Sequence, residues 1–148
     1  PWTMDRPIEQ HRRPDGVDDA TVEAVDTLTR ALETAEVARG HLLQFHRLTG
    51  TADTQLREAV DQLRSRGHDA IADRLDDVLV GRNVLEGRWT FQIIEEYDDS
   101  YFSVWRELEQ EARDALVGGR RHLLEAEMKE ANRTHGRPHH AATPPENT

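Results

Sequence analysis

The stretch VLEGRWTFQIIEEYDDSYFSVWRELEQEARDAL, residues 84–116, decides the fold class. Apolar side chains recur in it at spacings of three and four residues, with Glu111 as the one interruption: Ile94, Tyr97, Tyr101, Val104, Leu108 and Ala115. This heptad spacing is typical of a helix that packs lengthwise against a neighbouring helix. We therefore predict one long helix through the stretch.

A second heptad stripe lies nearer the N-terminus. We predict that this helix begins at Asp18 or Asp19, because either carboxylate can accept the free amide protons of the first turn. We expect it to end at Gly50, which can adopt the left-handed conformation that terminates helices. The alanines of the stripe leave room for bulky neighbours, which we expect to be the aromatic side chains of residues 89–105. The stripe consists of Leu28, Ala31, Ala35, Ala38, Leu42 and Phe45.

Shorter helices are predicted around these two. A hairpin follows Gly50: its first helix starts at Thr51 or Asp53 and stops at Gly67, and its second helix starts at Asp69. Residues 81–83 mark a kink, or else the helix continues straight to Trp89. The glycine pair at 118–119 ends or bends the long helix, since two glycines cost about 2 kcal/mol in a helix interior. A final helix is expected over residues 120–131.

These elements predict an all-α fold. No proline lies between Pro14 and Pro138, and no segment alternates apolar and polar residues over a useful length, so no strand is expected. Amphipathic helices must bury their apolar stripes against one another, which favours an antiparallel bundle of two long heptad helices, a short helical hairpin and a terminal helix. We expect an irregular N-terminal arm over residues 1–16, the bundle domain over 17–131 and a disordered tail over 132–148.

Composition excludes several function classes. The 148 residues carry 19 Lys and Arg against 29 Asp and Glu, a net charge of −10, which is unsuited to nucleic acid or anionic membranes. There is no cysteine, no long apolar run and no apolar segment near the start. We therefore expect a cytoplasmic protein without disulfides, membrane span or signal peptide. The two ends are mildly basic, and we interpret them as solvated tails or as arms that fold back onto the body or a neighbouring subunit.

Three strings resemble a group of small actinobacterial helical proteins without an assigned activity. They are GRNVLEGRWTFQIIEEYDD at residues 81–99, VGGRRH at 117–122 and EMKEANRTHGRP at 127–138. The resemblance covers about the second half of the chain. It implies a bacterial, cytoplasmic protein and nothing about chemistry.

Carboxylates spaced three apart are the candidate metal ligands. The pairs are Glu33 with Glu36, Asp73 with Asp76, and Glu96 with Asp99. Each pair shares a helix face and could hold Mg²⁺ with retained waters. The first two pairs resemble the Glu-x-x-Glu and Glu-x-x-Asp motifs of the all-α nucleotide pyrophosphohydrolases, although Asp73 replaces a glutamate and the gap between the pairs is long. Solvated helix faces explain the same pairs. Glu-x-x-His is absent, which disfavours a ferritin-like di-iron site.

A candidate contact patch lies near Trp89. On one continuous helix, a broad face would carry Arg82, Glu86, Trp89, Glu96 and Asp99, with Trp105 bordering the apolar stripe. A tryptophan beside charged groups suits a polar pocket or a subunit contact, and equally an ordinary boundary between core and solvent.

Three functions remain open. The first is a non-catalytic interaction or structural protein that forms a homodimer through its heptad faces, with an unidentified protein partner. The second is a hydrolase of phosphoanhydrides that uses Mg²⁺ on the paired carboxylates. The third is a bundle that holds a small apolar ligand between the alanine face and Trp89 or Trp105. We predict the first, with no catalytic residues and no cofactor.

Overall fold

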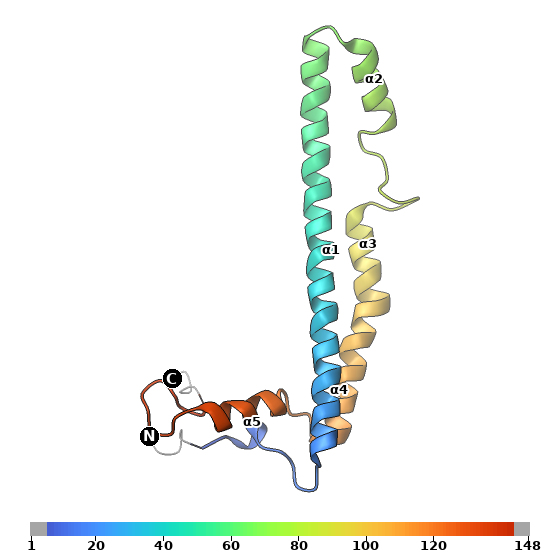
Figure 1. Ribbon diagram of the computed structural model, residues 1–148. Coiled ribbons are helices and arrows are strands. Elements are labelled where there is room, and N and C mark those ends of the chain that lie inside the picture. Colours follow the sequence, from blue (N-terminus) through green and yellow to red (C-terminus); the bar gives the residue numbers. More distant parts are fainter. Residues whose placement is uncertain (1–5, 144–148) are drawn as a thin grey trace, which may run out of the picture. The chain divides into compact units, whose positions relative to one another are not determined.

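The computed structural model describes residues 6–143, and within them the chain forms helices and loops without a strand (Figure 1). The prediction of an all-α fold is confirmed, and the antiparallel bundle arrangement stays a prediction. Within the described residues, none of the helices has both the length and the apolar character needed to cross a bilayer. In chain order the elements are the 3₁₀ turn η2 (Glu9–His11), α1 (Asp19–Ser65), α2 (Asp69–Val78), α3 (Thr90–Tyr97), the π-helical turn η3 (Asp98–Phe102), α4 (Ser103–Val117) and α5 (Leu123–Asn132).

The chain divides into two compact units. Unit 1 contains residues 1–34 and 104–148, and unit 2 contains residues 35–103. The first boundary falls inside α1, and the second falls between the first and second residues of α4. Each unit therefore has its own set of packing contacts.

Unit 1 has a small apolar core with a charged pair beside it. The core consists of Val22, Val25, Val117 and Leu123, with Val17 and Leu124 packed against it. Glu109 of α4 is only 4% exposed. Its Oε1 accepts hydrogen bonds from the Thr29 hydroxyl at 3.0 Å and from Arg113 Nε at 2.7 Å. Arg113 Nη1 also donates to the Gly119 carbonyl at 3.0 Å, so this pair joins α1, α4 and the loop after α4.

The two basic ends of the chain meet in unit 1. The turn η2 packs against α5. Arg13 donates from Nε and Nη2 to both carboxylate oxygens of Glu127, at 3.2 and 3.1 Å. Arg120 Nη1 donates to the Arg12 carbonyl at 3.1 Å. The described parts of these ends are therefore packed against one another, and the interpretation as solvated tails is wrong for them.

Polar contacts hold α2, α3 and η3 of unit 2 to the second half of α1. Arg64 near the end of α1 pairs with Asp73 of α2. His46 Nδ1 lies 2.6 Å from the Thr90 hydroxyl at the start of α3. Arg39 donates from Nε and Nη2 to the Asp98 carboxylate at 2.7 and 2.9 Å. These hydrogen bonds lower the pKa of Asp98.

Helix α1 continues through the position at which we expected it to end. It runs unbroken to Ser65, so the predicted stop at Gly50 and the separate helix from Thr51 or Asp53 are wrong. The Thr51 hydroxyl donates back to the Arg47 carbonyl at 3.1 Å instead of capping a new helix. Gly67, with φ +82°, ends this helix region as predicted, and α2 begins at Asp69.

The segment between α2 and α3 is a loop. Gly81 and Gly87 have φ of +74° and +73°, conformations that a helix does not contain. Residues 79–89 are accordingly not helical, and neither the kinked nor the straight helix predicted there is correct. The long helix expected over 84–116 begins only at Thr90.

The π-helical turn changes which side chains of α4 are buried. A π turn contains one more residue than an α turn, so it rotates all later residues by one position relative to the predicted stripe. The buried residues of α4 are Glu109, Arg113 and Val117. The predicted stripe residues Val104 and Leu108 are instead 45% and 55% exposed. The predicted apolar face is therefore wrong after Tyr97.

The glycine pair ends α4, which was one of the two predicted outcomes, the other being a bend. Gly118 and Gly119 have φ of +64° and +74°. The final helix starts at Leu123, three residues later than predicted, because the loop continues through His122, whose φ is +54°.

Candidate functional site

An apolar concavity of unit 2 has a volume of about 580 Å³, and we call it the unit 2 groove. Its walls are largely apolar and come from α1, from the loop after α2 and from the start of α3. Leu56, Leu79, Val84 and Trp89 supply the apolar surface, together with the small residues Gly50, Ala52 and Gly81. The polar lining residues are Thr49, Asp53, Arg82, Asn83 and Thr90.

Small residues and one carboxylate explain why the chain folds into a groove here. Gly50 and Ala52 present almost no side chain, so the α1 side of the groove remains open. Asp53 Oδ2 accepts a hydrogen bond from Arg57 Nε at 2.9 Å, and its Oδ1 accepts a longer one from the Gly81 amide at 3.4 Å. Both bonds lower the pKa of Asp53, that from Arg57 the most. Asp53 thereby ties the loop to α1.

Trp89 is held at its backbone while its ring stays accessible. Its amide donates to the Gln92 side-chain oxygen at 2.8 Å, which fixes the start of α3. The neighbouring Thr90 is buried and bonded to His46. Trp89 itself is 45% exposed. An accessible aromatic ring on an open apolar wall is suited to binding another apolar surface.

The structure brings together two of the six residues predicted for ligand or partner contact. Arg82 and Trp89 both line the groove. Glu86 lies in the same loop without lining the groove, and Glu96 of α3 pairs with Arg88 at 2.7 Å. Asp99 is an exposed residue of η3, and Trp105 is a half-buried residue of α4 in unit 1. The prediction that one continuous helix carries Arg82, Glu86, Trp89, Glu96 and Asp99 on a single face is wrong.

The carboxylates predicted as metal ligands lie apart from the groove. Asp73 and Asp76 both pair with Arg64, which favours a structural role for them. Glu33 lies beside His122 and Glu125: His122 Nδ1 is 3.9 Å from a Glu33 oxygen and 3.5 Å from a Glu125 oxygen. Among residues 6–143, these are the three whose ligand atoms are close enough together to share a metal ion. All three side chains are exposed, and the same distances fit ion pairs of a protonated histidine. Glu36, Glu96 and Asp99 belong to no such group in that part of the chain.

Sequence reasoning missed Leu56, Leu79 and Val84. Leu56 follows Phe45 by eleven residues, a helical spacing that would have placed both on one face of α1. The positions of Leu79 and Val84 depend on the path of the loop, which no local pattern indicates. Comparisons with protein-family models, with curated proteins and with solved structures give no match to this chain.

Proposed function

We propose that the chain is a non-catalytic helical interaction protein that forms a homodimer through unit 2. The observation that carries the proposal is the shortage of buried apolar side chains in this unit: only Val60 and Ala72 are buried. Eleven larger apolar side chains are at least 39% exposed: Val37, Phe45, Leu48, Ile71, Val78, Leu79, Val84, Leu85, Trp89, Phe91 and Tyr101. Exposed apolar side chains that lie together are typical of surfaces that associate, and Leu79, Val84 and Trp89 of this set line one groove.

A second copy supplies a surface that fits the groove. Phe45 and Leu48 precede the groove residues Ala52 and Leu56 on α1, and their spacing of three to four residues places all four on one side of the helix. This exposed ridge is therefore continuous with the wall of the groove. In a two-fold dimer, the ridge of each copy meets the groove of the other, so one patch serves as both surfaces.

Sedimentation velocity over a dilution series tests the homodimer. We expect a dimer at about 10 µM, with an affinity in the range of ordinary protein associations. Trp89→Ala and Phe45→Ser should each weaken the dimer by about 30-fold, which corresponds to the roughly 2 kcal/mol lost when a central aromatic residue is truncated. Leu108→Ala is the control, because Leu108 is an exposed apolar residue, at 55%, but belongs to unit 1. A wild-type monomer, or equal weakening by the control, contradicts the proposal.

The volume of the groove favours one second candidate function, the binding of a small apolar ligand. About 580 Å³ falls within the range of roughly 300–1,000 Å³ that small-molecule sites occupy. Arg82 at the groove could hold a carboxylate on such a ligand. Decanoate and phenylacetate are suitable probes, with Trp89 fluorescence measured in a Trp2→Phe/Trp105→Phe background. A saturable change on a monomeric chain would replace the dimer proposal, and an unchanged spectrum would reject this candidate.

A further inference from the structure

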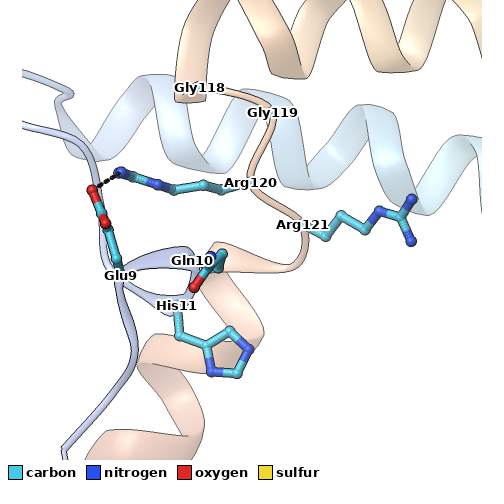
Figure 2. A pocket seen from close by; sticks show the side chains of 7 residues that line it. All are labelled: Glu9, Gln10, His11, Gly118, Gly119, Arg120 and Arg121. Atoms are coloured by element: carbon cyan, nitrogen blue, oxygen red, sulfur yellow. Dashed lines mark hydrogen bonds and ion pairs between the residues drawn. The ribbon is translucent and has the colours of Figure 1, made fainter.

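A second cavity, of about 500 Å³, lies in unit 1 and is not used by either function proposed above (Figure 2). The turn η2 lines it with Glu9, Gln10 and His11. The loop between α4 and α5 lines it with Gly118, Gly119, Arg120 and Arg121. The lining therefore contains two arginines, one histidine and one glutamate, in a chain whose net charge is −10, and Arg120 is directed toward Glu9 whereas Arg121 points away from it (Figure 2). A local excess of positive charge in an acidic protein indicates an anionic ligand.

Arg120 is held in position at this cavity. Its Nη1 donates to the Arg12 carbonyl at 3.1 Å, and its Nη2 lies 3.4 Å from a Glu9 carboxylate oxygen (Figure 2). A guanidinium fixed in advance loses little conformational freedom when it binds. Glu9 offsets the charge of this ordered guanidinium, so the excess of positive charge at the cavity comes from Arg121.

The other polar side chains of the cavity are available to a ligand. Within residues 6–143, the side chains of Gln10, His11 and Arg121 make no hydrogen bond or ion pair. The guanidinium of Arg121 offers five N–H donors in a fixed plane, and the Gln10 amide and His11 ring add further donors. This donor set matches the oxygens of a phosphate or carboxylate, which guanidinium groups bind through two parallel hydrogen bonds.

The glycine pair shapes the loop that carries both arginines. Gly118 and Gly119 have positive φ, and a Cβ on Gly119 would lie 2.7 Å from Asp114 Oδ1. The loop thus follows a path that other residues would strain, and it directs Arg120 and Arg121 to opposite sides in Figure 2. A neighbouring cavity of about 310 Å³ shares His11 and Arg121 and adds Lys129, together with Glu125 and Glu130. Space therefore exists for the organic part of a ligand beyond its anionic group.

We propose that this cavity binds the oxyanion group, phosphate or carboxylate, of a small organic molecule. Arg121 binds the oxygens through two hydrogen bonds, and His11 and Gln10 donate from η2, while the paired Arg120 and Glu9 form another side of the cavity. Asp114 and Glu9 are the nearby carboxylates that limit the total negative charge the site accepts.

Isothermal titration of the full chain with three probes tests this site. Phenyl phosphate and benzoate present the two oxyanions on the same ring, and inorganic phosphate presents the anion alone. We expect saturable one-to-one binding of at least one of the two ring compounds below about 1 mM, in the range of weak small-molecule affinities. Binding of phenyl phosphate alone would identify a phosphate site, and binding of both would identify a general oxyanion site. If neither ring compound binds, the proposal is wrong, even where inorganic phosphate binds weakly.

Two arginine variants separate this site from general charge attraction. Arg121→Gln should weaken binding by about 10-fold or more, because it removes a charge-assisted pair of hydrogen bonds. Arg106→Gln removes the same charge from an exposed position on α4 outside the cavity, and it should leave the affinity within about 2-fold of wild type. Equal weakening by both variants would overturn the proposal. Circular dichroism of both variants shows whether the fold is retained, and because both side chains are exposed, we expect unchanged melting curves.

Discussion

Breaking the charged pair of unit 1 should cost far more than truncating a leucine of the predicted stripe. Glu109→Leu removes the carboxylate that accepts hydrogen bonds from Arg113 and Thr29. The guanidinium of Arg113 is then left in a largely buried position without a counter-ion, at a cost of about 3–5 kcal/mol. Leu108 is 55% exposed, so Leu108→Ala should cost less than about 1 kcal/mol, under half the value of a fully buried leucine.

The double variant makes this prediction sharper. In Glu109→Leu/Arg113→Met both charges are absent, and similar replacements of buried pairs are close to neutral. The Gly119 carbonyl and the Thr29 hydroxyl lose their partners at about 1 kcal/mol each, so we expect a net loss of about 2 kcal/mol or less. The double variant should therefore be more stable than Glu109→Leu alone.

Urea unfolding followed by circular dichroism measures these differences. Glu109→Gln provides a milder variant, since it keeps an acceptor oxygen for Arg113 and should lose about half as much as Glu109→Leu. The reasoning is refuted if Leu108→Ala proves more destabilising than Glu109→Leu. That result would place the predicted stripe in the core and would mean that the π-helical turn does not shift the buried face.

Three further outcomes are expected. Gly40→Ala should stabilise the chain by about 0.8–1 kcal/mol in thermal unfolding, because Gly40 lies inside α1 and a Cβ there meets no atom within 4 Å. Gly119→Ala should destabilise the chain by at least about 1 kcal/mol, because residue 119 has a positive φ. Arg39 lowers the pKa of Asp98 in the folded state. The stabilising contribution of this pair should therefore be full above about pH 5 and fall as the pH drops below the ordinary carboxyl pKa of about 4. The difference in unfolding free energy between wild type and Asp98→Asn should accordingly shrink between about pH 5 and pH 3. Unit 2 contains 8 arginines and 13 acidic residues, a net charge of −5, so two copies repel each other and salt screens that repulsion. Sedimentation in about 0.5 M NaCl should therefore show a tighter dimer than sedimentation in low salt. A weaker dimer in high salt would indicate ion pairs between the copies.

Helix ends show how far local sequence determines this fold. Gly67 and the pair at 118–119 end helices as predicted, because the chain reverses or turns there and a positive φ is required. Gly50 is the same residue type and lies inside α1. The difference is in the flanking residues: Phe45, Ala52 and Leu56 continue the apolar spacing across Gly50, and one glycine costs only about 1 kcal/mol within a long helix.

The shift at η3 was beyond a pattern-based prediction. A strict heptad through Tyr101, Val104 and Leu108 contains only one polar break, whereas the true buried face contains Glu109 and Arg113. Charged residues at buried positions are stable here only because they bind each other across one helical turn and reach Thr29 and Gly119. Periodicity rules treat such residues as exposed.

The candidate site was predictable in part for a similar reason. Arg82 and Trp89 were predicted to share one face of a continuous helix; they belong instead to a loop, but both line the groove. Their true neighbours are set by Gly81 and by the contact between Asp53 and the loop, which are tertiary features. The positive charge of the two chain ends was evident in the sequence. The cavity between η2 and the loop after α4 was not, because it depends on how these segments pack.

Fluorine NMR of the chain labelled with 5-fluorotryptophan tests the central claim most directly. Three tryptophans give three signals, which single Trp→Phe variants assign. If unit 2 forms the homodimer through its groove, the Trp89 signal should change on dilution with the same midpoint as the mass, while the Trp105 signal stays constant. An unchanged Trp89 signal across the transition in mass, or a monomer at every concentration, would contradict the account.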